Sequence, residues 1–568
     1  MKIVTTEEMR HLEQAADATD VSYDQMMESA GRAVALACQR GLEVIGCPVL
    51  VLVGPGNNGG DGLVAARYLA QAGTGVTCYI WKRNVEDDAN FTRVEELGLP
   101  VIWAEEDEGW EGLRQRAGEA EVIIDALLGT GVDRPIGGSL RELLEVVGGI
   151  VRRRKEGEGR ELAIPSFPLS RPSSPMLPLV VAVDVPSGVN SDTGAVDPAT
   201  LPADLTVTFG CPKVGQLRFP AAEVVGRLTV ADIGIPPELL QPLELELASG
   251  DMIRGLLPQR PLNAHKGTFG KALLVVGSVN YTGAAYLAGA AATRVGTGLV
   301  TLALAGPLHP VIASKLTEAT YLILPHDLGV IAPEAIRVLA EKMGDYDALL
   351  LGPGITQEEP TVEFVRWLLG LRGAGRPGRI GFRAVEETEK RLQLPPLVID
   401  ADALNILART EGWAEHLPQG TILTPHPGEL SRLTGHSVAE INDRRIETAR
   451  ECAREWNQVV MLKGAFTVVA SPDDRTIVQP FANPGLASGG TGDVLAGAIV
   501  GLRAQGLGPF EAAVAGAYLH GLAGQLAREE VGDAGMVAGD LIPRLPLAIQ
   551  WLRNGRRAGN NPLPFQPS

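Results

Sequence analysis

The sequence predicts an α/β protein of two domains. Short apolar runs of strand length alternate with stretches of helical periodicity, and glycine-rich loops follow several of the predicted strands. With 568 residues, the chain is too long for a single hydrophobic core. A proline-punctuated segment at 236–262 separates two α/β patterns. We therefore expect a first domain at 1–238, a linker at 239–262 and a second domain at 263–554.

Composition and charge favour an intracellular protein that binds a small molecule. Hydrophobic residues make up 45% of the chain and charged residues 21%, as in ordinary soluble proteins. The longest apolar runs are far shorter than a membrane span, and no apolar signal segment follows Met1. The five cysteines are scattered without a CxxC, which argues for reduced thiols and against structural zinc. A net charge of −18 disfavours nucleic acid and anionic membranes as partners. We expect a cytoplasmic homo-oligomer.

The first elements are two helices and the start of a βαβ unit. Residues 5–20 are typical of a capped helix, because Thr5 and Glu8 have capping-box spacing. A second helix is predicted at 23–40 from its apolar side. Residues 48–73 then predict a buried strand, a glycine-rich loop and a helix.

The loop in this unit contains GPGNNG, formally a dinucleotide-binding pattern, which alone is a weak signal. Dinucleotide-binding sites usually have an acidic residue at the end of the next strand, but here the strand at 76–81 is followed by Lys82 and Arg83. The loop is rich in side-chain oxygens, which suit a hard cation or a polar ligand. These are Asn57, Asn58 and Asp61.

Two further predicted strands carry polar residues where they end. Asp125 lies in the segment 121–135, and Asp184 and Ser187 lie in the segment 179–194. In open parallel sheets, ligand sites gather at the carboxyl ends of strands. For any one of these positions a solvated loop is an alternative, but three of them together predict a site.

In this order, the motifs VGPGNNGGDG, DALLGTG and DVPSG resemble the epimerase domain of NAD(P)H-hydrate repair enzymes over residues 1–235. The resemblance implies a Rossmann-like three-layer domain that binds hydrated NADH or NADPH and holds a potassium ion at Asn58, Asp125 and Ser187. It makes Asp184 the acid/base candidate for inverting C6 of the nicotinamide ring. The hydrate would contact Asn57, Asn58, Gly59, Gly60, Asp61, Gly129, Thr130, Gly131, Val132, Asp133, Arg134, Pro135 and Asp184. The basic and then Ser/Pro-rich stretch at 151–178 is not needed by that pattern, and we expect a disordered surface insertion there.

A second α/β pattern opens at 265–304, where the strand LLVVG precedes a Gly/Ala-rich helix that follows Thr282. A flexible loop is expected around 369–381. Residues 459–470 are typical of a hairpin that carries Lys463. Further strands are expected to end within 349–355, 397–405 and 421–430.

The most informative stretch is 483–497, with the sequence NPGLASGGTGDVLAG. Its glycines let backbone N–H groups turn inward, and the apolar run after Asp493 predicts a buried helix. A helix N-terminus favours an anion, so Asp493 could take a proton from a hydroxyl that attacks a phosphoryl group held there. The alternative is a glycine-rich turn in which Asp493 is a plain N-cap.

Six ordered motifs resemble the dehydratase domain of the same repair system, on a ribokinase-like fold, over residues 250–552: GSVNYTGAA, GPG, DADALN, TPHPGE, KGAFT and NPGLASGGTGDVLAG. The resemblance implies ADP or ATP, with Mg²⁺, as phosphoryl donor, and Asp493 as the catalytic base. It assigns the nucleotide to Lys463, Gly464, Ala465, Phe466, Thr467 and Gly492. It assigns the hydrate to Ala284, Gly354, His426 and Asp493.

Two of these motifs keep structural alternatives. The prolines that flank His426 could simply fix a turn. Asp400 and Asp402 could be a carboxylate pair for a metal, but a strand-end turn is an equally good interpretation.

We interpret the chain as a bifunctional repair enzyme that epimerises hydrated NAD(P)H and dehydrates its S form. One rival is a small-molecule kinase of the ribokinase type fused to a nucleotide-binding domain, which would release a stable phosphorylated product. The other is a non-catalytic nucleotide sensor, which would need neither Asp184 nor Asp493.

Overall fold

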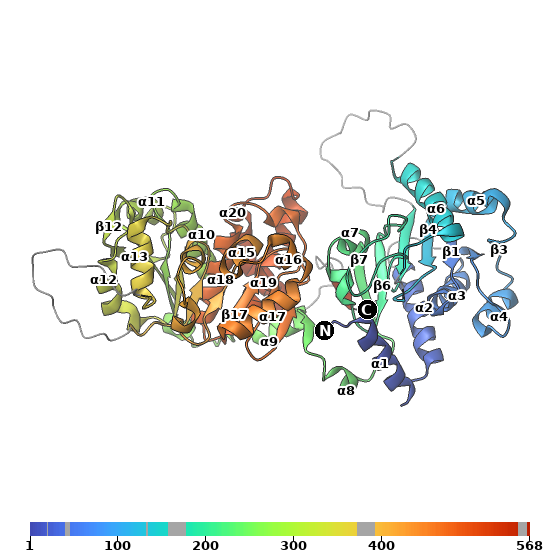
Figure 1. The fold of residues 1–568 in the computed structure, drawn as a ribbon, viewed down its shortest axis with the longest axis horizontal. Coiled ribbons are helices and arrows are strands. Elements are labelled where there is room, and N and C mark those ends of the chain that lie inside the picture. Colours follow the sequence, from blue (N-terminus) through green and yellow to red (C-terminus); the bar gives the residue numbers. More distant parts are fainter. Residues whose placement is uncertain are drawn as a thin grey trace, which may run out of the picture. The chain divides into compact units, whose positions relative to one another are not determined.

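The chain divides into two compact units in the computed structural model (Figure 1). The structure describes residues 1–19, 21–39, 46–131, 134–156, 178–371, 392–554 and 565–567. The first unit is Met1–Leu243 together with a short strand near the C-terminus, and the second unit begins at Glu244. Most of the expected insertion at 151–178 and of the expected loop at 369–381 lies outside the described residues.

The first unit is built on a parallel sheet, which confirms the Rossmann-like prediction. The strand order is β20-β7-β6-β5-β4-β1-β2-β3, and each neighbouring pair is parallel. The order reverses between β1 and β4, and open α/β sheets bind ligands at such a switch point. The strands are β1 (Pro48–Val53), β2 (Gly75–Ile80), β3 (Val101–Trp103), β4 (Val122–Ala126), β5 (Leu179–Val183), β6 (Leu205–Phe209), β7 (Arg227–Ala231) and β20 (Phe565–Pro567).

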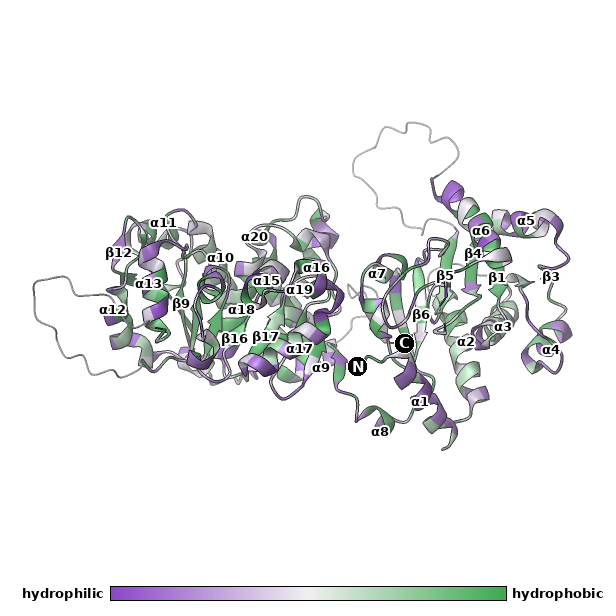
Figure 2. Cartoon of the chain, viewed as in Figure 1, coloured by the Kyte–Doolittle hydropathy of each residue, from purple (hydrophilic) through white to green (hydrophobic). Residues whose placement is uncertain are grey.

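Alternation along β1 explains the three layers of this unit. Successive side chains of a strand point to opposite faces. Val49, Val51 and Val53 therefore join one buried core with α2 and α3, whereas Leu50 and Leu52 join another with α5 and α6. The central strands are accordingly coloured as hydrophobic in Figure 2. The helices are α1 (Thr6–Asp17), α2 (Tyr23–Gln39), α3 (Asn57–Gln71), α4 (Ala89–Glu96), α5 (Glu111–Glu119), α6 (Gly138–Glu156), α7 (Ala221–Val224) and α8 (Pro237–Leu240).

A larger mixed sheet organises the second unit. Its order is β11-β10-β9-β14-β15-β16-β17-β18-β19-β8; the two pairs that β18 forms are antiparallel, and the other described pairs of this sheet are parallel. The predicted hairpin at 459–470 is confirmed as β17 and β18. The strands are β8 (Leu245–Leu247), β9 (Lys271–Val275), β10 (Leu299–Ala305), β11 (Thr320–Leu324), β14 (Ala348–Leu351), β15 (Leu397–Ile399), β16 (Ile422–Leu423), β17 (Val459–Leu462), β18 (Val468–Ala470) and β19 (Thr476–Val478); β12 (His326–Asp327) and β13 (Val330–Ile331) pair separately.

Close helix packing positions the glycine-rich loop of the second unit. A Cβ at Gly497 of α18 would lie 2.2 Å from the backbone oxygen of Ala288 in α10. A Cβ at Gly516 of α19 would likewise lie 2.6 Å from Ile499. Glycine at these positions lets the three helices approach backbone to backbone. The helices are α9 (Gly250–Leu256), α10 (Thr282–Arg294), α11 (His309–Ala313), α12 (Ala335–Lys342), α13 (Glu359–Leu368), α14 (Asp402–Leu407), α15 (Pro427–Thr434), α16 (Val438–Asp443), α17 (Arg445–Trp456), α18 (Thr491–Ala504), α19 (Pro509–Val531), α20 (Ala538–Leu541) and α21 (Leu545–Asn554).

Much of the expected linker at 239–262 is part of the second unit. Strand β8 pairs with β19, and α9 contributes Ile253 to the main apolar core. The five cysteines are buried and free. Among the described helices, none has both the length and the apolar character that crossing a membrane requires.

We expect the second unit to be more stable as a separate protein when it retains β8 and α9. A fragment that starts at Glu244 should therefore unfold at a higher temperature than one that starts at Asn263. Leu247, Ile253 and Leu257 are buried, and each such side chain contributes roughly 1.5–3 kcal/mol. Thermal unfolding of the two fragments checks this, and equal Tm values would contradict it.

Candidate active sites

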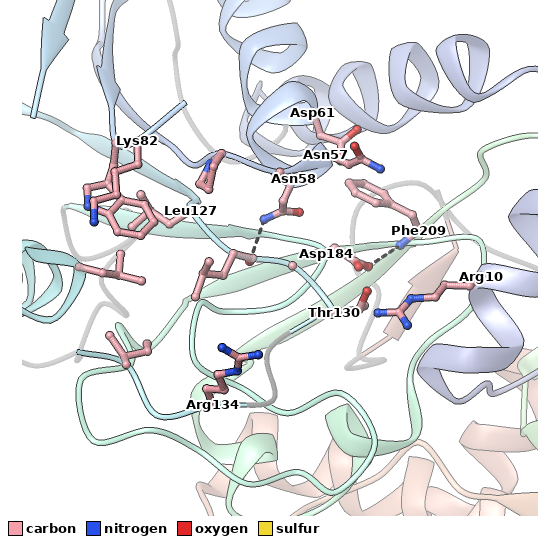
Figure 3. Close-up of a pocket in the computed structure, with 18 of the residues that line it drawn as sticks. Arg10, Asn57, Asn58, Asp61, Lys82, Leu127, Thr130, Arg134, Asp184 and Phe209 are labelled. Carbon is pink, nitrogen blue, oxygen red and sulfur yellow. Dashed lines mark hydrogen bonds between the residues drawn. The ribbon is translucent and has the colours of Figure 1, made fainter. Parts of the chain in front are cut away.

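A cavity of about 780 Å³ lies at the carboxyl ends of β1, β2, β4 and β5 (Figure 3). This is the switch point of the first sheet, where such folds bind their ligands. The residues that line it include most of those expected to contact the hydrate: Asn57, Asn58, Asp61, Gly129, Thr130, Gly131, Arg134, Pro135 and Asp184. Val132 and Asp133 lie outside the described residues.

Two glycines expected to contact the hydrate are packed against protein instead. A Cβ at Gly59 would lie 2.1 Å from the carbonyl oxygen of Gly54, and a Cβ at Gly60 would lie 2.8 Å from the sulfur of Met27. Neither glycine is among the residues that line the cavity. Both lie in the first turn of α3, which begins at Asn57, and glycine there lets the helix pack closely against Gly54 and Met27.

The three residues expected to hold potassium converge below this loop. Asp125 and Ser187 are fully buried, and the Ser187 hydroxyl donates to Asp125 Oδ1 at 2.6 Å. The Ser187 hydroxyl also accepts from the Leu128 N–H at 2.9 Å, while the Asn58 amide donates to the Leu128 carbonyl at 2.9 Å. Burial raises the pKa of Asp125, and hydrogen bonds from Ser187 act in the opposite direction. The cluster is thus a set of neutral oxygens around one buried carboxyl group.

Asp184 is held by a buried ion pair. Its φ of 61° is in the left-handed region, which a non-glycine residue adopts only when its surroundings impose it. Lys213, which is 1% exposed, places its ammonium 2.5 Å from Asp184 Oδ1. The Thr208 hydroxyl donates to the same oxygen at 2.8 Å, and the Gln216 amide donates to the Asp184 carbonyl at 2.8 Å. Both the side chain and the backbone of Asp184 are therefore fixed.

Two further carboxyl groups share the cavity with Asp184. Asp61 comes from α3 and Glu13 from α1. Burial, Asp184 and Glu13 raise the pKa of Asp61 well above its ordinary value. Burial also raises the pKa of Glu13, against the attraction of Lys213. Sequence reasoning missed Lys213 and Glu13, because each lies in a segment without a local motif.

In the second unit, the glycine-rich loop leads into α18 as predicted. Gly490 is the N-cap, with a φ of 89°, and Asp493 is the third residue of the helix. The interpretation of Asp493 as an N-cap is therefore wrong. Within the described part of the chain its carboxyl group has no hydrogen-bond partner, and burial and Asp400 raise its pKa to about 7. A Cβ at Gly492 would meet only the Lys463 ammonium, at 3.7 Å.

Lys463 is the cation of this site. Its ammonium lies 2.6 Å from Asp400 Oδ1 and 3.7 Å from Glu429 Oε2. Burial opposes the charge of Lys463, but Asp400 and Glu429 raise the pKa of its ammonium above the ordinary value. Asp400 also accepts from the Thr424 hydroxyl at 2.7 Å. A buried, permanently charged ammonium next to a helix N-terminus forms an anion-binding site.

The turn that follows Lys463 is held by hydrogen bonds between its backbone and the Thr467 hydroxyl. Gly464 has a φ of 136°, and its N–H donates to the Thr467 hydroxyl at 3.2 Å. The Thr467 hydroxyl donates back to the Gly464 carbonyl at 2.7 Å. Arg445 donates to the Lys463 carbonyl at 3.0 Å, which also fixes the start of the turn. Ala465 and Phe466 complete it.

The structure gives His426 a local structural role. His426 is the N-cap of α15, and its Nδ1 accepts from the N–H groups of Gly428 and Glu429 at 3.0 and 3.3 Å. Burial and the nearby Lys463 lower the pKa of the ring. Nε2 therefore carries the ring proton, and on the half-exposed imidazole it lies 3.4 Å from Glu429 Oε1.

Asp400 and Asp402 have different partners, so they do not act as one pair. Asp402 accepts from the Thr356 N–H at 2.9 Å and from the Gln357 amide at 3.1 Å. Ala284 and Gly354 are neighbours, since a Cβ at Gly354 would lie 2.7 Å from that of Ala284. Glycine at position 354 therefore lets its turn pack closely against the N-terminal end of α10.

Comparisons with known proteins agree with this division. A family model described as NAD(P)H-hydrate dehydratase matches residues 272–547, and one described as YjeF-related protein N-terminus matches residues 23–215. Similar relatives are the bifunctional NAD(P)H-hydrate repair enzymes Nnr of Thermofilum pendens (37% identical), Moorella thermoacetica (36%) and Escherichia coli K12 (32%). The first two alignments cover 97% of both chains, and the third covers 94% of this chain and 90% of that protein. The crystal structure of ADP/ATP-dependent NAD(P)H-hydrate dehydratase from Bacillus subtilis, co-crystallised with ATP and Mg²⁺, is 33% identical over 54% of this chain and 98% of that chain, with a TM-score of 0.43.

We expect the buried Lys213–Asp184 ion pair to contribute to the stability of the first unit. Lys213→Met should lower the free energy of unfolding of the first unit by about 3–5 kcal/mol, because it leaves a buried carboxylate without its partner. Lys213→Met combined with Asp184→Asn should recover part of that loss. Urea unfolding of the three proteins checks this; an unchanged midpoint for Lys213→Met would contradict it.

Proposed function

The chain belongs to the family of bifunctional NAD(P)H-hydrate repair enzymes, and we propose that each unit carries one of the two activities. The second unit dehydrates the S form of hydrated NAD(P)H at the expense of ADP or ATP. The first unit interconverts the R and S forms, so that both can be repaired. Water added across the C5=C6 bond destroys reduced nicotinamide as a hydride donor, and the two reactions together restore it.

The observation that carries the dehydratase assignment is Asp493 beside an anion-binding site. The N-terminus of α18, Gly492 and the turn Lys463–Thr467 would hold the phosphates of the nucleotide. A hydrate bound at Ala284, Gly354 and His426 would present its 6-hydroxyl to Asp493. A carboxyl group with a pKa of about 7 can accept a proton at neutral pH and is basic enough to be effective.

Phosphorylation then makes elimination possible. The 6-hydroxyl attacks the terminal phosphoryl group while Asp493 takes the hydroxyl proton. Phosphate is a much better leaving group than hydroxide, so the N1 lone pair expels it from C6. Loss of a proton from C5 restores the C5=C6 bond. The protein supplies positioning and charge stabilisation, as in other phosphoryl transfers.

In the first unit, Asp184 is the catalytic carboxylate, and the cavity around it binds the hydrate. The residues that line this cavity come from the ends of several strands, which is the usual ligand position in this type of fold.

Two metal ions fit the residues present. Potassium would be held by oxygens of Asn58, Asp125 and Ser187, the ligand type that a hard monovalent ion accepts, and would add positive charge beneath the cavity. Mg²⁺ usually binds one or two carboxylates plus substrate phosphates. Asp400 and Glu429, the buried carboxyl groups beside Lys463, would hold it, where it would neutralise phosphate charge. The cytoplasmic location and the homo-oligomeric state stay predictions.

Product analysis tests the proposed function. With hydrated NADPH and ADP or ATP, the protein should release one phosphate for each NADPH formed. A stable phosphorylated product would indicate a small-molecule kinase, and the absence of nucleotide consumption would indicate a binding protein.

Asp493→Asn should lower kcat for dehydration by about 10²–10⁴-fold, since it removes the proton acceptor but keeps the size of the side chain. Because burial and Asp400 raise the pKa of Asp493 to about 7, wild-type kcat/KM should fall as the pH drops below 7. The residual activity of the variant should lack this decline. Epimerisation should be unchanged, and exposed Asp443 offers a matched Asp443→Asn control. A near wild-type kcat would refute the assignment.

Asp125→Asn should abolish the potassium dependence of epimerisation, because it removes the only charged oxygen of the proposed three-residue site. Dehydration of the S hydrate should continue at the wild-type rate. Epimerisation rates in potassium and in lithium salts check this, together with anomalous scattering from crystals. Equal stimulation of both proteins by potassium would rule the site out.

A further inference from the structure

Three carboxyl groups reach the cavity of the first unit. The ammonium group of Lys213 forms an ion pair with one of them, Asp184. Asp61 comes from α3, Glu13 from α1 and Asp184 from the end of β5. Figure 3 shows Asp61 and Asp184 entering the same part of the cavity from different elements. Arg10, Lys82 and Arg134 also line the cavity, but burial still disfavours the ionisation of all three carboxyl groups at once.

Asp184 is fixed as an acceptor with one oxygen free. Lys213, the Thr208 hydroxyl and the Phe209 N–H all donate to Oδ1, at 2.5, 2.8 and 3.3 Å. Among the described residues, none donates to Oδ2. The second oxygen of a firmly held carboxylate is therefore available to a molecule in the cavity.

Asp61 has the opposite environment. It is 8% exposed, and no group in the described part of the chain hydrogen-bonds to its carboxyl. Arg83 is committed elsewhere, since it donates to Asp88 at 2.7 Å and to the Gly54 and Gly56 carbonyls at 3.0 and 2.8 Å. The charged groups that face Asp61 are Glu13, Asp184, Arg83 and Lys213, and burial together with the two carboxylates keeps its pKa well above the ordinary value.

Inversion at C6 by exchange of its hydroxyl uses one carboxyl group that donates a proton and one that accepts a proton. C6 of the hydrate carries a hydroxyl and is bonded to the ring nitrogen N1. One route to inversion removes the hydroxyl from one face of C6 and adds a water oxygen to the other. The leaving oxygen requires a proton donor, and the attacking water requires a proton acceptor.

We propose that Asp61 and Asp184 are the acid and the base of the epimerase, with Lys213 as the residue that positions Asp184; this rests on the proposed function of the first unit. The Asp61 carboxyl gives its proton to the 6-hydroxyl as the C6–O bond breaks and the N1 lone pair forms an N1=C6 bond. Water then adds to the opposite face of C6, and Asp184 takes its proton as the N1 lone pair is restored. After one inversion Asp61 is ionised and Asp184 is protonated. The reverse reaction starts from this form.

Asp61→Asn is the decisive variant, because asparagine has nearly the shape of a protonated aspartate but no transferable proton. Epimerisation should fall by about 10²–10⁴-fold in kcat with little change in KM. The wild-type rate should decline at alkaline pH as Asp61 loses its proton, and the residual rate of Asp61→Asn should not. A near wild-type rate for Asp61→Asn, or a large loss with Glu13→Gln instead, would overturn the proposal.

Two controls separate this proposal from a general loss of structure. Asp87→Asn changes an exposed aspartate with a φ of 60°, and it should epimerise at the wild-type rate. Dehydration of the S hydrate by the second unit should be unaffected in Asp61→Asn. Lys213→Met should slow epimerisation and alter its pH profile, whereas a purely structural lysine would change stability alone.

Labelled water tests the chemistry itself. In H₂¹⁸O, each inversion should introduce one solvent oxygen at C6. If the wild-type protein inverts the hydrate but retains the original oxygen, the acid–base pair is wrong while the epimerase function stands. If no inversion occurs at all, the proposed function of the first unit is wrong.

Discussion

A buried ion pair between a lysine and a strand-end aspartate underlies the site in each unit. Lys213 pairs with Asp184 at the end of β5, and Lys463 pairs with Asp400 at the end of β15. Parallel strands bring several carboxyl groups to one edge of a sheet, where their mutual repulsion would open the structure. One ammonium at each edge allows these groups to remain buried together. The cost of desolvating both partners is high, which is why such pairs are rare outside functional sites.

The same pairing explains why Asp184 and Asp493 have different surroundings. Asp184 is next to its lysine and accepts three hydrogen bonds on one oxygen. Asp493 is in the first turn of α18, where Lys463 is already bonded to Asp400. Burial and Asp400 therefore raise the pKa of Asp493 to about 7. For Asp493, burial and the charges around the carboxyl group raise the pKa, which the motif alone does not determine.

Much of the fold could be predicted from the sequence, because apolar runs and glycine-rich loops are local signals. The strand at 48–53, the hairpin at 459–470 and the buried helix predicted from the apolar run after Asp493 are confirmed. The segment 239–262 was misjudged, since its prolines indicated a linker while β8 is formed only by pairing with β19, far along the chain. Lys213 and Glu13 were missed for a related reason: they reach Asp184 and Asp61 through tertiary folding. The inward packing of Gly59 and Gly60 depends on Gly54 and Met27, which the loop sequence alone does not place.

The contact between Gly497 and Ala288 determines what can vary around the second site. Because α18 rests on the backbone of α10 at Gly497, this contact, which helps to position Asp493, does not depend on a side chain of Ala288. Residues elsewhere in that core can therefore change during evolution without moving the carboxyl group. Any side chain at position 497, by contrast, would push the helix away from its neighbour. Mutational tolerance in this unit should follow from which positions are glycine, more than from distance to the reacting atoms.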